Sequence, residues 1–265
     1  MRIQWLAMQP ISVNVVAQNE QENIGRCLES VQWADEIVVI DGKSTDQTPQ
    51  IARQYTDRVI MREWDGAVQQ NNFAVSAASH DWIFAIDADE QVSGELAESI
   101  RQLRQCGMDC DAYRVPRRVF YMGRWIRYGG WYPDYKVRFF NRTKTRWAGM
   151  DPHNKIQMDS GSAVGTLTGD LHHYTYQDVA DHLRRVNKYT SIMANEMFQN
   201  NVRPTLWKMI GHPAWRFFRM YLLRGGLLDG RAGLAIATIG SFYVFLKYLK
   251  LWELQSGHSQ SSDSI

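Results

Sequence analysis

Two aspartates separated by one small residue, Asp87 and Asp89, follow an apolar run at residues 82–86. Carboxylate oxygens are preferred ligands of Mg²⁺ and Mn²⁺. A pair at the end of a buried strand could hold such a cation and leave coordination positions open for diphosphate oxygens. The same spacing also occurs in surface loops, so the buried run in front of it is what favours a metal site.

Polar side chains also follow two earlier apolar runs, at residues 11–17 and 36–40. These side chains are Gln18, Asn19 and Glu20 after the first run and Asp41, Ser44, Thr45 and Asp46 after the second. Ligands of an open parallel sheet bind beyond the carboxyl ends of its strands. Acidic groups gathered on that edge repel each other unless a cation or hydrogen-bond donors lie between them. A divalent metal is therefore expected here.

Two other phosphate-binding motifs do not fit the same region. A P-loop ending in Gly42, Lys43 and Ser44 would need a glycine five residues before Gly42, where the chain has Ile37. A dinucleotide fingerprint needs spaced glycines after the first strand, and residues 18–22 contain no glycine. The spacing therefore excludes a P-loop and disfavours an NAD or FAD site.

Short apolar runs alternate with helical stretches between residues 11 and 105, which predicts an α/β fold with a mostly parallel sheet. The predicted strands are 11–17, 36–40, 58–62 and 82–86, with the third at an edge. The predicted helices run through 24–31, cover 68–78 and begin near Ser93. Mixed or irregular strands are expected over 113–175, a helix over 176–198 and further helix over 204–252.

Composition places the chain among globular proteins, because 45% of its 265 residues are hydrophobic and 22% are charged. The net charge of +2 conceals a strong segregation. Residues 1–113 carry 8 basic and 18 acidic side chains, residues 114–146 carry 10 and 1, and residues 203–252 carry 8 and 1. This pattern predicts a cationic centre in the first part and anionic surfaces for the basic parts to bind.

Several motifs, in order along the chain, resemble family 2 inverting glycosyltransferases of the GT-A fold. They are Val15 to Glu20 with Asn23-Ile24, Glu36 to Asp41 with Ser44-Thr45-Asp46 and Thr48, and Asp87-Ala88-Asp89-Glu90. Others are similar to the branch that contains lipopolysaccharide-core β-glucosyltransferases. These are Trp64-Asp65-Gly66, Gln70, Asn72, Gly129 to Asp134, Arg138-Phe139-Phe140, His172-His173-Tyr174 and Gly225 to Gly230. The resemblance extends from residue 11 to residue 253.

The resemblance implies a metal-dependent enzyme that moves a hexose, with inversion, from a nucleotide sugar such as a UDP-hexose to a glycolipid or polysaccharide precursor such as lipopolysaccharide core. The implied cofactor is Mg²⁺ or Mn²⁺, held by Asp87 and Asp89. The implied nucleotide-sugar contacts are Asn19, Glu20, Asp41, Ser44, Gln70, Asp87, Ala88 and Arg138. The bound metal would neutralise the charge that develops on the departing diphosphate.

An inverting displacement also needs a carboxylate that removes the proton of the acceptor hydroxyl. Asp134 is the first candidate by resemblance, with Asp151 and His153 as competitors. A surface ion pair with Lys136 or Arg138 is the alternative role for Asp134.

The chain departs from the branch pattern at three places, one of which is Gly42-Lys43, where relatives carry small residues. Asn71 stands where relatives carry Lys or Arg, and His153-Asn154 stands where they carry His-Glu. The last two differences favour the alternative function, a catalytically weakened relative that binds a phosphorylated glycan.

The expected organisation is a GT-A domain at 1–202 with a helical C-terminal extension. Residues 11–105 would form its nucleotide-sugar half and 106–202 its acceptor half, followed by a basic amphipathic helical extension at 203–255 and a disordered tail at 256–265. Nucleic acid is not an expected partner, because the acidic first part would repel a polyanion.

Residues 232–246 are uncharged and mostly apolar, and residues 247–252 add lysines, Tyr and Trp. A membrane-spanning helix needs about 20 such residues, so this run is expected to fall short. It fits a helix at the surface of an anionic membrane, with a helix packed on the main domain as the alternative. With no secretory signal at its start and three cysteines, the chain is expected in the cytoplasm, peripherally bound to the inner face of the cytoplasmic membrane.

Overall fold

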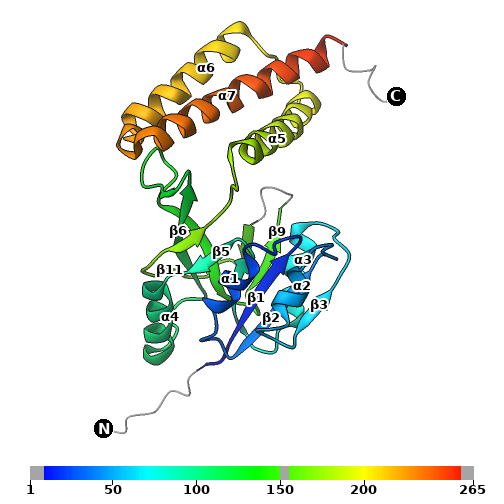
Figure 1. Ribbon diagram of the computed structural model, residues 1–265, viewed down its shortest axis with the longest axis vertical. Helices are drawn as coiled ribbons and strands as arrows, with labels where there is room; N and C mark the ends of the chain where they lie inside the picture. The colour runs from blue at the N-terminus through cyan, green and yellow to red at the C-terminus, as the bar shows by residue number, and fades with distance from the viewer. Residues whose placement is uncertain (1–8, 150–154, 258–265) are drawn as a thin grey trace. The chain divides into compact units, whose positions relative to one another are not determined.

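Four parallel strands form one part of the main sheet in the computed structural model, which describes residues 9–149 and 155–257 (Figure 1). They are β1 (Ile11–Ala17), β2 (Glu36–Asp41), β3 (Val59–Met61) and β4 (Trp82–Asp87). Their order is β3-β2-β1-β4, with β3 at the edge. The predicted strands are therefore confirmed to within about one residue at each end. The β-branched and aromatic runs of β1, β2 and β4 are largely buried, whereas the edge strand β3 is only partly covered and Met61 is exposed.

The sheet continues beyond β4 with strands of mixed direction. β8 (Asp134–Asn141) pairs antiparallel with β4, and β6 (Ala112–Tyr121) pairs antiparallel with β8. Shorter strands complete the sheet and a separate hairpin, namely β5 (Glu90–Val92), β7 (Arg124–Trp125), β11 (Val164–Thr166), β12 (Leu171–His173), β9 (Thr145–Ala148) and β10 (Lys155–Met158). The expectation of mixed strands over 113–175 is thus confirmed.

Helices flank this sheet, and the first three of them connect its four parallel strands. They are α1 (Ile24–Glu29), α2 (Thr48–Ala52), α3 (Ala67–Ala77) and α4 (Gly94–Cys106). α4 begins where the sequence predicted, because the Ser93 hydroxyl accepts a hydrogen bond from the Leu96 amide at 3.2 Å. A mostly parallel sheet with helices around it and a helical C-terminal part is the α/β architecture expected of the GT-A fold.

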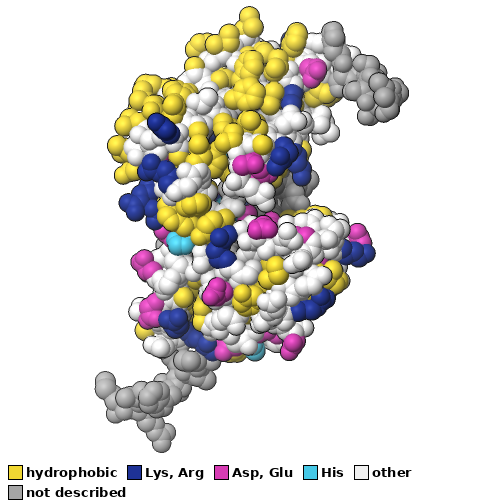
Figure 2. All heavy atoms as spheres, viewed as in Figure 1, with side chains coloured by type: hydrophobic (Ala, Val, Ile, Leu, Met, Phe, Trp, Pro, Cys, Tyr) yellow, Lys and Arg dark blue, Asp and Glu magenta, His cyan; other side chains and the backbone are white. Residues whose placement is uncertain are grey.

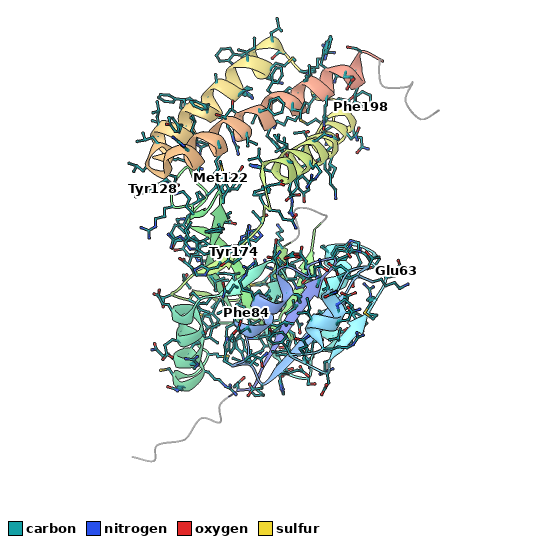
Figure 3. All side chains as sticks on the ribbon, in the orientation of Figure 1. Glu63, Phe84, Met122, Tyr128, Tyr174 and Phe198 are labelled. Carbon is teal, nitrogen blue, oxygen red and sulfur yellow. The ribbon has the colours of Figure 1, made fainter. Side chains whose placement is uncertain are left out.

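The core of this sheet is aromatic where β4 meets β8. Phe84, labelled in Figure 3, is fully buried. Phe139 is also fully buried, and the two ring centroids lie 6.4 Å apart. Trp82 also packs against Phe139, at a centroid distance of 5.0 Å. This packing fixes the strand whose end carries Asp87.

The chain divides into two compact units, each made of two segments. The first contains the chain up to Arg118 and Asp134–Tyr174, and the second contains Val119–Pro133 and the chain from Thr175 onward. The second unit is built from α5 (Val179–Gln199), α6 (Leu206–Phe218), a π-helical turn η1 (Arg219–Leu223), a 3₁₀ turn η2 (Gly226–Asp229) and α7 (Gly230–Gln255).

This division differs from the expected boundary between residues 202 and 203. α5 belongs with α7, because Ala194 packs in one buried cluster with Val244 and Tyr248. The Lys250 ammonium also donates hydrogen bonds to the Asn187 carbonyl at 2.7 Å and to other α5 groups. Periodicity predicted the α5 helix but does not say which partner covers its apolar face.

Asp229, which directly precedes α7, forms hydrogen bonds with the inserted segment Val119–Pro133. Its carboxylate is buried and accepts hydrogen bonds from the Tyr128 amide at 2.8 Å and from the Arg127 amide at 3.1 Å. Its backbone carbonyl accepts a further bond from the Arg124 guanidinium at 2.9 Å. A buried acidic residue in a basic stretch thus organises the loop that precedes it in the chain.

The length argument against a spanning helix is wrong. Residues Gly226–Gln255 form a 30-residue helical segment that is long and apolar enough to cross a membrane, by length and composition only. The helix includes residues on both sides of the apolar run 232–246. One third of its most apolar window is buried within the protein, and Ile236, Val244 and Leu251 pack against the neighbouring helices.

Candidate active site

The loops after β1 and β2 are joined by a network of hydrogen bonds around Asn19 and Asp41. The Asn19 side-chain oxygen accepts from the Thr45 amide at 2.8 Å, and the Ser44 hydroxyl accepts from the Asn19 amide at 2.8 Å. Asn19 has a φ of 55°, in the left-handed region that Asn tolerates better than most residues. The two loops therefore hold each other in one fixed arrangement.

Asp41 is fully buried beneath this loop. One of its carboxylate oxygens accepts from the Ser44 amide and the other from the Ser44 hydroxyl, both at 2.7 Å. Glu20 lies in the adjoining loop, where its amide donates to the Thr48 hydroxyl at 2.7 Å. Asn19, Glu20, Asp41 and Ser44 lie in adjoining loops, and their nucleotide contacts stay a prediction. The Asp41 carboxylate is buried and engaged by Ser44, so its contact with a nucleotide would be indirect.

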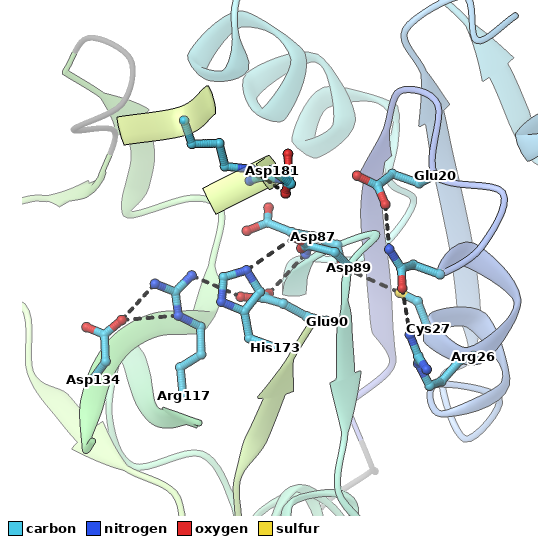
Figure 4. Close-up of polar contacts among 12 residues, drawn as sticks. Glu20, Arg26, Cys27, Asp87, Asp89, Glu90, Arg117, Asp134, His173 and Asp181 are labelled. Carbon is cyan, nitrogen blue, oxygen red and sulfur yellow. Dashed lines mark hydrogen bonds and ion pairs between the residues drawn. The ribbon is translucent and has the colours of Figure 1, made fainter. Parts of the chain in front are cut away.

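Glu90 is the buried centre of a second polar network at the end of β4. Its carboxylate accepts from the Arg138 guanidinium at 2.8 Å and from the Arg117 guanidinium at 3.3 Å. Arg138 also donates to Asp87, whose side chain remains 42% exposed. Two guanidinium groups thus neutralise the buried Glu90. Figure 4 shows one of them, that of Arg117, between Glu90 and Asp134.

Arg138 is itself almost fully buried, which by itself would lower its pKa. The carboxylates of Asp87 and Glu90 outweigh burial and raise the pKa of Arg138 above its ordinary value. The guanidinium is therefore charged at every physiological pH. Its Nε atom is buried and has no hydrogen-bond partner among the residues that the structure describes.

Asp89 lies beside His173, with 3.2 Å between the Asp89 Oδ2 and the His173 Nε2 atoms (Figure 4). The antiparallel pairing of β12 with β5 sets this contact, because His173 is in register with Glu90. The Tyr174 amide then donates to the Asp89 carbonyl at 2.9 Å, and the Arg26 guanidinium covers the Tyr174 ring at 3.6 Å. An imidazole is thereby fixed against the second aspartate of the Asp-x-Asp pair.

Asp134 lies at the start of β8 and is held by two cations. Its carboxylate accepts from the Arg117 guanidinium at 2.7 Å and lies 3.1 Å from the Lys136 ammonium. Burial alone would raise the pKa of Asp134, but Arg117 and Lys136 reverse that effect and lower it below the usual range. Asp134 is therefore ionised at neutral pH, as a proton acceptor must be.

A cleft in the first unit joins several of these groups. Its charged lining consists of Asp87, Arg117, Lys136, Arg138 and Lys155. Arg117, Lys136 and Arg138 are paired with Asp87, Glu90 and Asp134, and Lys155 adds a further positive charge, so the cleft keeps a net positive lining that suits a phosphate-bearing ligand.

The remaining predicted residues fall in different places. Gln70 is buried at the start of α3, where its amide donates to the Glu63 carbonyl at 2.8 Å and its oxygen accepts from Arg62 at 2.8 Å. Ala88 is buried between the two aspartates. Asp151 and His153, the competing candidates for the base, lie outside the described residues.

A divalent cation can be tested against the side chains at the end of β4. Within residues 9–149 and 155–257, no three His, Cys, Asp or Glu side chains are grouped so that they could hold a metal ion by themselves. Asp89 and His173 supply one oxygen and one nitrogen donor, and the exposed Asp87 carboxylate is two residues away in the sequence. This set fits a metal whose coordination is completed by diphosphate oxygens and water.

Sequence reasoning quoted His173 within a motif but gave it no role, and it missed Glu90 and Arg117 as partners. These contacts join residues far apart in the chain, such as Asp89 and His173, which are separated by 84 positions. The available signal was the pair His172-His173 in a short run beginning with the buried Leu171. Such a run is typical of a strand that presents alternate side chains to a site.

Replacement of Arg138 by Gln is expected to lower the free energy of unfolding by about 3 kcal/mol, because the longer contact to Arg117 would be the one ion pair left to the buried Glu90, beside the hydrogen bond from the Asp87 amide. Urea denaturation followed by circular dichroism would measure this loss. Arg101→Gln is the matched control, since Arg101 pairs with Glu98 on the exposed face of α4 and its loss should cost about 0.5 kcal/mol or less. Equal losses in the two variants would show that the buried network does not stabilise the fold.

Residues 12–161 match the family model described as glycosyl transferase family 2. The chain is 28% identical over 254 residues to the lipopolysaccharide core biosynthesis glycosyltransferase LpsC of Rhizobium meliloti, covering 92% of each chain. It is 28% identical to an uncharacterized glycosyltransferase of Rickettsia typhi, covering 93% of this chain and 88% of that one. Glucosyl-3-phosphoglycerate synthase from Mycobacterium tuberculosis, solved with Mg²⁺ and UDP, aligns with a TM-score of 0.37 and 22% identity over 41% of this chain and 44% of that chain.

Proposed function

Because this chain belongs to glycosyl transferase family 2, we propose that it moves a hexose from a nucleotide-sugar donor to a saccharide acceptor with inversion at the anomeric carbon. The observation that carries the proposal is the continuous polar network from Asp87 through Arg138, Glu90 and Arg117 to Asp134. It connects the strand end suited to a metal-bound diphosphate with a carboxylate suited to act as a base.

The donor would bind along the edge formed by the loops after β1, β2 and β4. Asn19, Glu20 and Ser44 would contact the nucleotide, and Asp41 would hold their loop through its two bonds to Ser44. Arg138 and Lys155 would face the diphosphate in the cationic cleft. Asn71, which also lines that cleft, is neutral, so the diphosphate relies on the other cations there.

Asp89 and His173 would hold the divalent metal, Mg²⁺ or Mn²⁺, with Asp87 beside them. When bound, the metal would neutralise the negative charge that grows on the departing diphosphate. The neighbouring Tyr174 amide holds the Asp89 backbone, which limits how far the carboxylate can move. Asp87 is restrained in turn by Arg138.

Asp134 would accept the proton of the acceptor hydroxyl as that oxygen attacks the anomeric carbon. Arg117 and Lys136 keep its carboxylate ionised and fix its orientation. After proton transfer, the same two cations would face a neutral carboxyl group and favour release of the proton to solvent.

The relative LpsC acts in lipopolysaccharide core biosynthesis, as its name states. We propose a lipid-linked saccharide of that class as the acceptor and the inner face of the cytoplasmic membrane as the place of reaction. The basic residues concentrated in 114–146 and 203–252 support an anionic acceptor or surface.

Binding and turnover across UDP-, GDP- and dTDP-hexoses, each with Mn²⁺, with Mg²⁺ and with a chelator, would test the proposal. We expect one nucleoside diphosphate to bind only when a divalent cation is present, and its sugar nucleotide to be slowly hydrolysed. Binding of a phosphorylated glycan, with no donor bound under any metal, would favour the catalytically weakened relative instead.

A further inference from the structure

α6 exposes its apolar side to solvent, which is the reverse of an ordinary surface helix. Trp207, Ile210, Ala214 and Phe218 recur at spacings of three and four residues, which places them on one face. We call the exposed set Leu206, Trp207, Ile210, Trp215 and Phe218 the α6 apolar face. Leu206 is 77% exposed, Trp207 75% and Ile210 66%.

The other side of α6 is already used for packing within the second unit. Pro213 is buried, and its carbonyl accepts a hydrogen bond from the Ser241 hydroxyl of α7 at 2.8 Å. His212 lies 3.1 Å from the Tyr248 hydroxyl of the same helix. The α6 apolar face is therefore held outward by contacts that its own unit makes.

Several basic residues lie within α6 and shortly after it, close in sequence to the α6 apolar face. Lys208, Arg216, Arg219 and Arg224 have no carboxylate partner among the residues that the structure describes. Burial and the neighbouring charges of Arg224 and Arg219 lower the pKa of Arg216, so these cations repel one another. An anionic partner would relieve that repulsion. Figure 2 shows the apolar side chains gathered over the helices of this unit with lysines and arginines beside them.

We propose that the α6 apolar face inserts into the interfacial layer of an anionic phospholipid membrane, with Lys208 and Arg219 contacting the lipid phosphates. Two tryptophans and a phenylalanine beside basic residues are the composition of helices that lie in this layer, where indole rings bury their apolar area and keep their N–H groups hydrated. The sequence pointed to residues 232–252 for membrane contact. We assign that contact to α6 instead, because Leu206, Trp207 and Ile210 are all more exposed than Trp252, which at 53% is the most exposed large apolar side chain of α7.

Membrane contact through α6 rests on the proposed function, which places the reaction at a membrane face, but its test is separate because vesicle binding requires neither donor nor acceptor. The full chain would be mixed with vesicles of phosphatidylcholine alone or with phosphatidylglycerol, and binding measured by flotation. We expect strong binding to the anionic vesicles only. The triple variant Trp207→Ser, Ile210→Ser and Phe218→Ser should bind at least about 10-fold more weakly, because it removes three inserted apolar side chains.

Two further variants separate insertion from charge attraction. Lys208→Gln with Arg219→Gln should weaken binding to anionic vesicles and reduce its dependence on salt. Trp64→Ser is the control for loss of an exposed tryptophan, since Trp64 is 39% exposed in the first unit, and it should bind as wild type does. Circular dichroism would establish that each variant is folded.

Brominated lipid gives an independent measure of insertion. Quenching of tryptophan fluorescence by these lipids should decrease in Trp207→Phe and stay unchanged in Trp64→Phe. Wild-type vesicle binding by the triple variant would overturn the proposal. A lipid-free dimer that the triple variant abolishes would also overturn it, since the face would then bind a second copy. Resistance of the bound protein to alkaline carbonate would overturn it as well, since α7 would then cross the membrane.

Discussion

Asp89→Asn is expected to reduce kcat/KM for sugar transfer by about 10³-fold or more and to abolish metal-dependent nucleotide binding. The substitution keeps the shape of the side chain and removes the negative charge that lies 3.2 Å from the His173 Nε2 atom. A neutral amide is a poor ligand for a cation that must also carry a diphosphate. Calorimetric titration of a nucleoside diphosphate with and without Mn²⁺, together with steady-state kinetics, would measure both effects.

Asp81→Asn is the matched control for this variant. Asp81 directly precedes β4, at the opposite end of the strand from Asp87, and pairs on the surface with Arg142. Its side chain is 59% exposed, so its loss should leave both binding and turnover within about 2-fold of wild type. Unchanged metal-dependent binding in Asp89→Asn would show that the metal is held elsewhere.

Asp134→Asn is expected to keep nucleotide binding and to lower kcat by about 10²- to 10⁴-fold, the range that a general base contributes. The amide preserves the size of the side chain but cannot accept a proton. Single-turnover kinetics with saturating donor would separate the loss in chemistry from any loss in binding.

The same measurements on Asp151→Asn and His153→Asn would decide among the three candidates for the base. Retained turnover in Asp134→Asn with loss in Asp151→Asn or His153→Asn would transfer the role to that residue. Asp134→Glu should recover part of the activity if a carboxylate at this position is what the reaction needs.

The pH dependence gives a second readout of Asp134. The base is active when ionised, so activity falls as the pH drops through its pKa. Because Arg117 and Lys136 lower that pKa, the acid limb should lie below the pH expected for an ordinary aspartate. Lys136→Gln removes one of the two cations and should move this limb to higher pH.

The strands of the parallel half were predictable because each is a short buried run with a polar end. Val13, Val39 and Phe84, for example, are fully inaccessible to solvent, and no amphipathic helix would produce such runs. The Asp-x-Asp pair followed from that prediction, since the end of a buried strand is a fixed position. The local sequence pattern therefore predicted both the parallel strands and the half of the candidate site that contains Asp87 and Asp89.

The other half of the site depends on contacts between distant residues. The residues next to Glu90 in the sequence do not indicate that Arg117 and Arg138 will neutralise its carboxylate. His173 reaches Asp89 only because β12 pairs with β5 in one particular register. The same limitation applies to α6, whose periodicity predicts an apolar face without stating that this face stays exposed.

Because the chain is synthesised from its first residue to its last, the Asp229 contacts can form only late in synthesis. The amides of Arg127 and Tyr128 leave the ribosome before their acceptor, which follows 102 and 101 residues later. The first unit can be completed once Tyr174 has emerged, whereas the inserted segment Val119–Pro133 must wait for the start of α7. A nascent chain that stops short of Asp229 would therefore leave this segment without its carboxylate anchor and open to proteases and chaperones.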